Sequence, residues 1–324
     1  MAPREAMPGQ NPPYGASIDY FLKDASKEKV EVTILGPDGQ KIRTLETTNK
    51  PGLNRTWWDL RYEPTRPVEL RATPPGNPHI WEEKRFAGQD TRPVFYYGVG
   101  RARSRGGEGE SFMRSTTGEP TLGPLAAPGV YTVRLSIGSE QITQKLTVLK
   151  DPNTGATDKD VADSSTLALK VYNDANTSVA LINQIEWIRR QIDEMKKMLA
   201  ADPSKHHLIE SANALDTKFR AVEEPLLDET IAEGDQKSFR GPLGLYLKFV
   251  WLGAEVGTGG ADVSGNSDFP PTQSEIEVFD LLNKQLEESK VQLKQLNDQG
   301  LSAFNKEMQN AGALRIAVPQ LDQQ

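Results

Sequence analysis

The 324-residue sequence predicts a mixed α+β fold in which an N-terminal β-sandwich is followed by an antiparallel α-helical bundle. Residues 16–150 contain short runs of alternating apolar and polar side chains, separated by Gly and Pro turns, as in sandwiches. Residues 151–324 place apolar side chains three or four positions apart, which is typical of helices with one buried face. Proline divides in the same way, with 15 before residue 151 and 7 after it.

The predicted domain order begins with a Pro-rich linker at 1–15. The sandwich follows over 16–150 and includes a long Gly/Arg-rich insertion over about 62–125. The helical domain follows over 151–324, with its boundary near Asp151-Pro152.

Six segments of the first domain read as strands. Val30, Val32 and Ile34 share one face, and Pro37-Asp38-Gly39 has the composition of a tight turn, which predicts a hairpin. The expected strands cover 16–22, 29–35, 40–45, 55–61, 130–137 and 141–149. Trp57 and Trp58 are adjacent in a strand, so their side chains must lie on opposite faces. We expect one of them in the core and the other half-exposed.

Three long helices are expected in the second domain. The first has a stripe from Leu167 to Leu199, the second begins at the Asp202-Pro203 cap, and the third begins at the capping box Thr272–Glu275. The stripe of the third continues past Gly300 to Phe304 and Met308. The apolar segment 243–252 suggests a short helix packed on these three, with a partner-binding or membrane-surface segment as the alternative.

Composition excludes several classes of function. The chain has no Cys and only three His, which removes disulfides, thiolate catalysis and His-rich metal sites. Residues 151–324 carry 17 Lys and Arg against 28 Asp and Glu, so we expect no nucleic-acid partner. No apolar run is long enough for a membrane span. No phosphate-binding or dinucleotide motif is found either, and we expect no cofactor, no metal and no catalytic residue.

A few residue motifs weakly resemble metal-binding, catalytic or ligand-binding sites. Asp262–Asp268 spaces oxygen ligands as a calcium loop does, but it lacks the glycine and the closing glutamate, which favours an ordinary loop. Asp59 has no second carboxylate placed opposite it by a motif, so a strand- or turn-stabilising role is expected. Glu223-Glu224 and Glu287-Glu288 are expected on solvated helix faces. The Gly/Arg-rich stretch 98–110, flanked by aromatic residues, is either a mobile insertion or a binding loop.

The first domain resembles a FlgD-type immunoglobulin-like domain. The resemblance rests on the hairpin Val30–Leu45, the strand Gly52–Arg61 with its G-x-N-x-x-x-W-D pattern, and the P-G-x-Y-x-x-x-L strand Pro128–Leu135. With Asn11–Ala16 and Asp151-Pro152 included, the chain is similar to the C-terminal region of bacterial sortilin-like proteins with BNR-type β-propellers, often labelled glycosyl hydrolases. The propeller itself is missing from this sequence.

The resemblance implies a non-catalytic accessory or interaction module in a secreted or cell-envelope protein, with a protein partner such as the propeller. Any glycoside hydrolase chemistry would then lie outside this chain. The N-terminus shows no signal peptide, so a cytoplasmic location is expected if Met1 is the true start. The alternative is a carbohydrate-binding module, for which the candidate ligand-binding residues are Trp57, Trp58, Trp81, Tyr96 and Tyr97.

Overall fold

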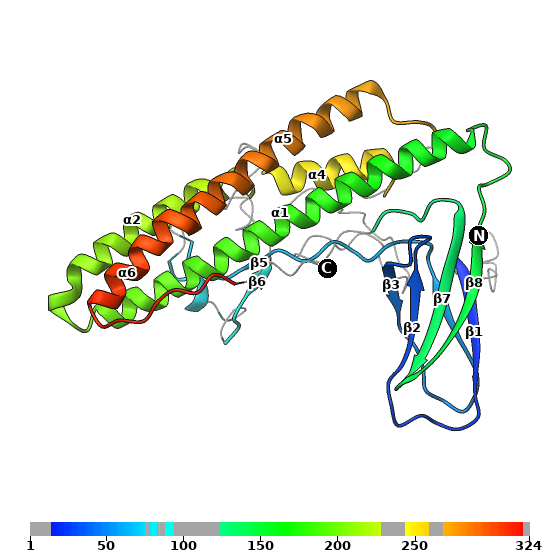
Figure 1. The fold of residues 1–324 in the computed structure, drawn as a ribbon, viewed down its shortest axis with the longest axis horizontal. Helices are drawn as coiled ribbons and strands as arrows, with labels where there is room; N and C mark the ends of the chain where they lie inside the picture. Colours follow the sequence, from blue (N-terminus) through cyan, green and yellow to red (C-terminus); the bar gives the residue numbers. More distant parts are fainter. Residues whose placement is uncertain are drawn as a thin grey trace, which may run out of the picture. The chain divides into compact units, whose positions relative to one another are not determined.

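The protein has a mixed α+β fold made of two compact units (Figure 1). The computed structural model describes residues 14–74, 78–82, 84, 88–93, 123–227, 244–258 and 268–319. The β unit comprises Met1–Glu63 and Gly123–Asp158, and the helical unit comprises Pro64–Leu122 and Lys159–Gln324. The described residues between 64 and 93 thus cluster with the helices, although they lie in sequence between strands of the β unit.

The β unit contains two antiparallel sheets whose inward side chains form one buried cluster. In the smaller sheet, β1 (Ala16–Leu22) pairs with β4 (Gly52–Trp58). The larger sheet has the spatial order β3 (Lys41–Leu45), β2 (Val30–Leu35), β7 (Gly129–Ile137), β8 (Glu140–Val148). All six predicted strands are therefore present.

The largest difference from the predicted strand boundaries is in β4, whereas the ends of the other five strands lie within one residue of the prediction. β4 begins at Gly52, three residues earlier than expected, and ends at Trp58. Two residues later Leu60 adopts a left-handed backbone conformation, with φ of 60°, which lies outside the β region and turns the chain away from the strand direction. The Asp59 carboxylate accepts a hydrogen bond from the Arg61 amide at 3.1 Å and stabilises this turn.

Trp58 and Tyr131 form the centre of the β-unit core. Trp58 is fully buried, and its ring lies edge-on to that of Tyr131 with centroids 5.2 Å apart. The Trp58 indole donates to the Arg61 carbonyl, and the Tyr131 hydroxyl donates to the Ala127 carbonyl. Burial raises the pKa of Tyr131 to about 12. Both large rings thus bury their surface without leaving a polar atom unpaired.

Trp57 lies half-buried on the opposite face of β4. The prediction that the two tryptophans point to opposite faces, one of them into the core, is therefore confirmed.

The helical unit is built around α1 (Asp158–Leu199), whose predicted stripe from Leu167 to Leu199 is buried apart from half-buried Asp174. The other long elements are α2 (His206–Glu223), α4 (Leu245–Gly253), α5 (Gln273–Gln295) and α6 (Ser302–Asn310). The π-helical segment η5 (Leu296–Leu301) joins α5 to α6. All these helices contribute to one buried cluster.

The predicted helix starts are confirmed. Asp202 accepts a hydrogen bond from the Ser204 amide at the short helix η2 (Pro203–Lys205), which leads into α2. Thr272 and Glu275 form the reciprocal capping box of α5. Residues 245–252 of the predicted apolar segment lie in α4, with Leu245, Tyr246, Leu247, Phe249 and Leu252 buried in the shared cluster.

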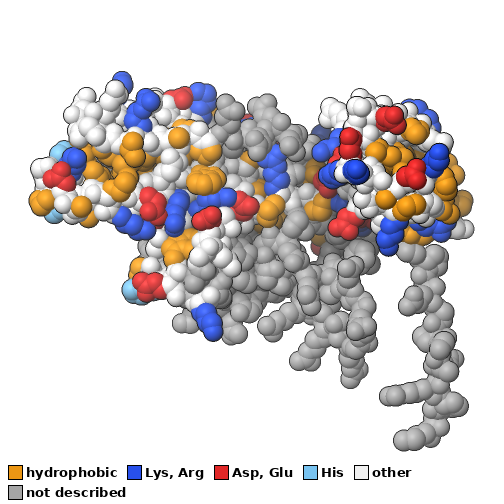
Figure 2. Space-filling model, turned by 90° about the horizontal axis from the view of Figure 1, so that it is seen from below, with side chains coloured by type: hydrophobic (Ala, Val, Ile, Leu, Met, Phe, Trp, Pro, Cys, Tyr) orange, Lys and Arg blue, Asp and Glu red, His pale blue; other side chains and the backbone are white. Residues whose placement is uncertain are grey.

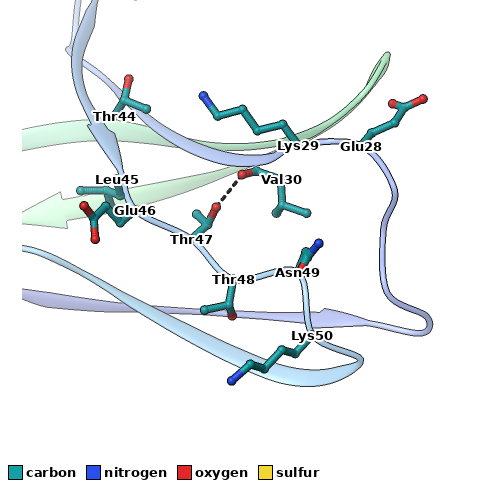
Figure 3. Close-up of a pocket in the computed structure, with 10 residues that line it drawn as sticks. All are labelled: Glu28, Lys29, Val30, Thr44, Leu45, Glu46, Thr47, Thr48, Asn49 and Lys50. Atoms are coloured by element: carbon teal, nitrogen blue, oxygen red, sulfur yellow. Dashed lines mark hydrogen bonds between the residues drawn. The ribbon is translucent and has the colours of Figure 1, made fainter.

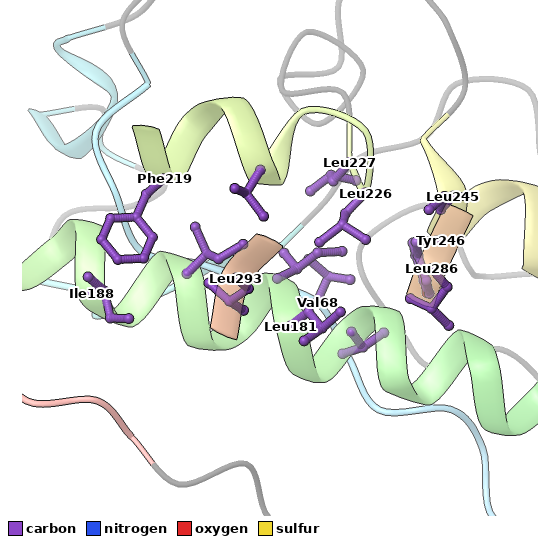
Figure 4. Packing of buried hydrophobic residues seen from close by; sticks show 14 of the residues in the cluster. Val68, Leu181, Ile188, Phe219, Leu226, Leu227, Leu245, Tyr246, Leu286 and Leu293 are labelled. Carbon is purple, nitrogen blue, oxygen red and sulfur yellow. The ribbon is translucent and has the colours of Figure 1, made fainter. Parts of the chain in front are cut away.

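An extended segment from residue 66 to residue 73 runs along α1. Its Val68 and Leu70 are buried in the helical core. In Figure 4, Val68 lies among labelled leucines of α1, of α5 and of the turn that follows α2. Leu70 belongs to β5 (Glu69–Leu70), which pairs with β6 (Arg92–Pro93). Apolar side chains alone do not hold this segment, because its backbone amides also need partners.

Side chains on one face of α1 supply those partners. The amide oxygen of Asn176 accepts from the Arg66 amide, and that of Asn183 accepts from the Glu69 amide, at 2.9 and 2.8 Å. One carboxylate oxygen of Glu186 accepts from the amides of both Arg71 and Ala72. Asp193 completes the series by accepting from the Thr73 amide at 3.2 Å. We call these four α1 side chains the α1 ladder.

Asp174 makes one polar contact between α1 and α5. The amide of Asn283 donates to its carboxylate at 2.9 Å. Burial nevertheless raises the pKa of Asp174 above its ordinary value, because a partly dehydrated charge is disfavoured.

Trp58→Ala should lower the free energy of unfolding of the β unit by about 3–5 kcal/mol, because it leaves a large cavity beside Tyr131. Trp57→Ala is the matched control on the same strand and should cost much less. Denaturant unfolding followed by circular dichroism measures both. Equal losses for the two variants would contradict the assignment of Trp58 to the core.

Asp174→Asn should raise the melting temperature at pH 7, because it removes a charge whose burial is unfavourable and keeps an acceptor for Asn283. The folded state binds the Asp174 proton more tightly than the unfolded state does, so the wild type gains stability as the pH falls. The advantage of the variant should therefore shrink between pH 7 and pH 4. Thermal unfolding at several pH values measures it, and a variant that is less stable at pH 7 would contradict this explanation.

Candidate functional site

The described surface mixes apolar and charged side chains. In Figure 2, hydrophobic side chains are interspersed with acidic and basic ones on the described part of each unit. On the face shown, this mixture lacks the continuous basic patch typical of nucleic-acid-binding proteins.

A shallow groove of about 670 Å³ lies beside the start of β2 and the end of β3 (Figure 3). Its wall is formed by Glu28, Lys29, Val30 and residues 44–50. The Thr47 hydroxyl donates to the Val30 carbonyl, and the Thr48 amide donates to the Tyr20 hydroxyl at 2.9 Å. These polar groups hold the connection between β3 and β4, so we assign the groove a structural role.

The same connection is fixed by Asn54, which is buried on the inner face of β4. Its side-chain amide donates to the carbonyls of Lys50 and Gly52, at 2.8 and 3.0 Å. Its oxygen accepts from the Thr48 hydroxyl. The asparagine of the G-x-N-x-x-x-W-D pattern therefore fixes a loop conformation.

The outward face of the β1–β4 sheet is the stronger candidate for a binding surface. The strand register sets Ser17 opposite Trp57, Asp19 opposite Arg55, and Phe21 opposite Leu53. We call these six residues the β1–β4 strip. It begins at a half-buried tryptophan, continues through an ion pair and ends at an apolar pair.

The apolar end of the β1–β4 strip is unusually exposed, since Phe21 and Leu53 have 70% and 73% of their surface accessible. In the middle, the Arg55 guanidinium donates two hydrogen bonds to the Asp19 carboxylate, at 2.6 and 3.0 Å. These bonds lower the pKa of Asp19 and raise that of Arg55. The strip thus offers a fixed charge pair next to apolar surface that the described residues of the β unit leave exposed.

The five candidate ligand-binding residues do not form one platform in the described structure. Trp58 is in the core, whereas Trp57 belongs to the β1–β4 strip. Trp81 lies in η1 (Ile80–Glu82) of the helical unit, with the guanidinium of Arg190 5.3 Å from its ring centroid. Tyr96 and Tyr97 lie outside the described residues.

The weak chemical motifs have structural explanations where they are described. Asp59 stabilises the turn after β4 and lies 3.7 Å from the Arg43 guanidinium, as the strand- or turn-stabilising prediction requires. The possible calcium loop falls almost entirely outside the described residues, as does the Gly/Arg-rich stretch 98–110. Among the residues that the structure describes, no group of three His, Asp or Glu side chains could hold a metal ion.

A buried charge cluster in the helical unit was missed by the sequence prediction. Arg189 of α1, with 2% of its side chain exposed, bonds to Glu186 at 3.1 Å, to Glu223 at 2.6 Å and to Asp216 at 3.0 Å. The prediction that Glu223 lies on a solvated face is wrong, because its side chain is 1% exposed. For Glu224, Glu287 and Glu288 the prediction is confirmed, since all three are exposed.

Spacing within each helix could have indicated only part of this cluster. Glu186 and Arg189 are three residues apart on α1, and Asp216 and Glu223 are seven apart on α2, so each pair shares a helix face. Glu186 also belongs to the α1 ladder, and its second oxygen accepts the amides of Arg71 and Ala72. The cluster therefore joins α1, α2 and the segment 66–73, which is a structural role.

Comparison of the chain with protein-family models, curated proteins and solved structures gave no match. Among the described helices, none is both long enough and apolar enough to cross a membrane.

Glu223→Gln should destabilise the helical unit by roughly 3 kcal/mol, because it removes a charge that compensates buried Arg189. Glu224→Gln, one residue further along, changes an exposed side chain and should stay within about 0.5 kcal/mol of the wild type. Urea unfolding of both variants measures the difference. If the two were equally stable, Glu223 would not be buried with Arg189.

Proposed function

We propose that the chain is a non-catalytic interaction module, made of a FlgD-type immunoglobulin-like β-sandwich and an antiparallel helical bundle, that binds a protein partner through the β1–β4 strip. The observation that carries this proposal is the exposed pair Phe21 and Leu53 beside the Asp19–Arg55 ion pair.

The sandwich assignment is supported by what the motif residues do. Trp58 and Tyr131, from the two patterns that carry the resemblance, pack against each other between the sheets. Asn54 and Asp59 stabilise the loops on either side of β4. These roles are structural, so they support a resemblance in fold and leave ligand binding to other residues.

A protein partner fits the chemistry of the β1–β4 strip. Burying a phenylalanine or leucine side chain is worth roughly 1.5–3 kcal/mol, so Phe21 and Leu53 together can supply a central anchor. The charge pair beside them can select the orientation of a partner. The similarity to sortilin-like proteins suggests a β-propeller or another envelope protein as that partner.

A carbohydrate-binding module is the alternative, because Trp57 is half-exposed on the same strip and could stack on a sugar ring. A second alternative from the same resemblance is the accessory part of a glycoside hydrolase whose chemistry lies in the missing propeller.

The double variant Phe21→Ser/Leu53→Ser should weaken partner binding at least tenfold, because it removes the apolar anchor. Val130→Ser is the matched control, since Val130 is 51% exposed on the other sheet. The partner is first recovered by capturing envelope proteins of the source cells on the immobilised chain. Its dissociation constant is then measured by titration against the wild type and each variant.

Two results would contradict the protein-binding proposal. One is equal partner binding by the double variant and the wild type. The other is a change in tryptophan fluorescence on addition of soluble glycans, lost in Trp57→Phe, from a chain that captures no protein partner. That result would favour the carbohydrate-binding module.

A further inference from the structure

We propose that the chain forms a symmetric dimer in which β8 pairs antiparallel with β8 of a second copy, about a two-fold axis at Gln144. The larger sheet of the β unit would then continue from one copy into the other. This goes beyond the proposed function and uses a different surface, since the β1–β4 strip belongs to the other sheet.

The two edge strands of the larger sheet differ in how well they are protected from pairing with another strand. At the β3 edge, the Ile42 carbonyl accepts from the Glu63 amide at 2.8 Å, and the Thr44 amide donates to the Glu63 carboxylate at 2.7 Å. β3 is also short, and its pairing with β2 is irregular after Ile34. A short, irregular and covered strand is how proteins usually protect a sheet edge.

The β8 edge has none of these protections in the described structure. β8 pairs with β7 through nine consecutive residues without a bulge and has no other neighbour among the described strands. Its sequence contains no proline. Its central charge, Lys145, reaches back to β7, where its ammonium donates to the Thr132 hydroxyl at 2.8 Å. A long, regular edge of this kind is a template for pairing with another strand.

The inner face of β8 is only partly covered. Residues opposite each other in the register share a face, so Ile142 and Leu146 lie on the same side as Leu135 and Tyr131 of β7. Tyr131 is buried in the core, yet Ile142 is 65% exposed. The described smaller sheet has two strands against four, and the apolar side of β8 is left partly uncovered.

A second copy of β8 fits this edge because the strand is self-complementary. With the axis at Gln144, all nine residues find partners. Ile142 then lies opposite Leu146 of the second copy, and Leu146 lies opposite Ile142. Gln144 faces its own counterpart, where two amides can bond to each other.

Charge favours the same register. Lys145 lies opposite Thr143 of the second copy, and Glu140 lies opposite Val148, so like charges do not face each other. An axis at Lys145 would instead set two lysines opposite each other and leave Glu140 and Gln141 without partners. Dimers with two-fold symmetry are the commonest oligomers of soluble chains.

The register can be tested by single cysteines, because the chain has no cysteine of its own. Directly opposed residues of antiparallel strands have Cα atoms about 4.5–5.5 Å apart, within disulfide range. Gln144→Cys should therefore oxidise to a disulfide-linked dimer. Gln141→Cys is the matched control, since two copies of residue 141 would be six residues apart along the strands, about 20 Å.

Sedimentation equilibrium on the full chain tests the dimer itself. The wild type should sediment at twice the chain mass of 35.8 kDa. Gln144→Lys sets two lysines opposite each other at the axis and should give the monomer mass, whereas Gln141→Lys faces Thr147 and should leave the dimer intact. Both changed side chains are exposed in the monomer, so each variant should keep the circular dichroism spectrum of the wild type.

A wild type that sediments as a monomer at a chain concentration of about 100 micromolar would overturn the proposal. A dimer that Gln144→Lys and Gln141→Lys affect equally would overturn it too, as would equal disulfide formation by Gln144→Cys and Gln141→Cys.

Discussion

The structure depends on how backbone amides outside regular helices and sheets find hydrogen-bond partners. The segment 66–73 buries Val68 and Leu70 against the helices, and burial of its amides would be costly without acceptors. The α1 ladder supplies those acceptors in series along one helix. Glu186 does so while also pairing with Arg189, which in turn bonds to Asp216 and Glu223 of α2. One set of polar side chains thus joins three parts of the helical unit.

In the β unit, the residues of the sequence motif at 52–59 stabilise the fold. Trp58 fills the core, Asn54 fixes a loop, and Asp59 stabilises a turn. None of these side chains is left to bind a ligand. What the unit presents to other molecules is instead its uncovered surface: the β1–β4 strip on one sheet and the edge strand β8 on the other. We propose both as interaction surfaces, and they lie on different sheets of the β unit.

Local pattern was sufficient to predict much of this fold. The strands, the long helices and the caps at Asp202 and Thr272 depend on neighbours in sequence, and the sequence therefore predicts them well. The α1 ladder and the Arg189 cluster depend on contacts between residues far apart in sequence, such as Glu186 with Ala72. A glutamate that pairs with a buried arginine of another helix and one on a solvated face look the same in a sequence, which is why the prediction for Glu223 was wrong. The β1–β4 strip was missed apart from Trp57, because Phe21 and Leu53 come together only through the strand register.

Amide hydrogen exchange across residues 66–73 tests most directly the claim that α1 side chains hold this segment by its backbone. The amides of Arg71 and Ala72 lie outside any helix, and Arg71 directly follows the two-residue strand β5. If Glu186 accepts both, they should exchange as slowly as amides inside α1. Exchange at the rate of an open loop, while α1 stays protected, would contradict the account.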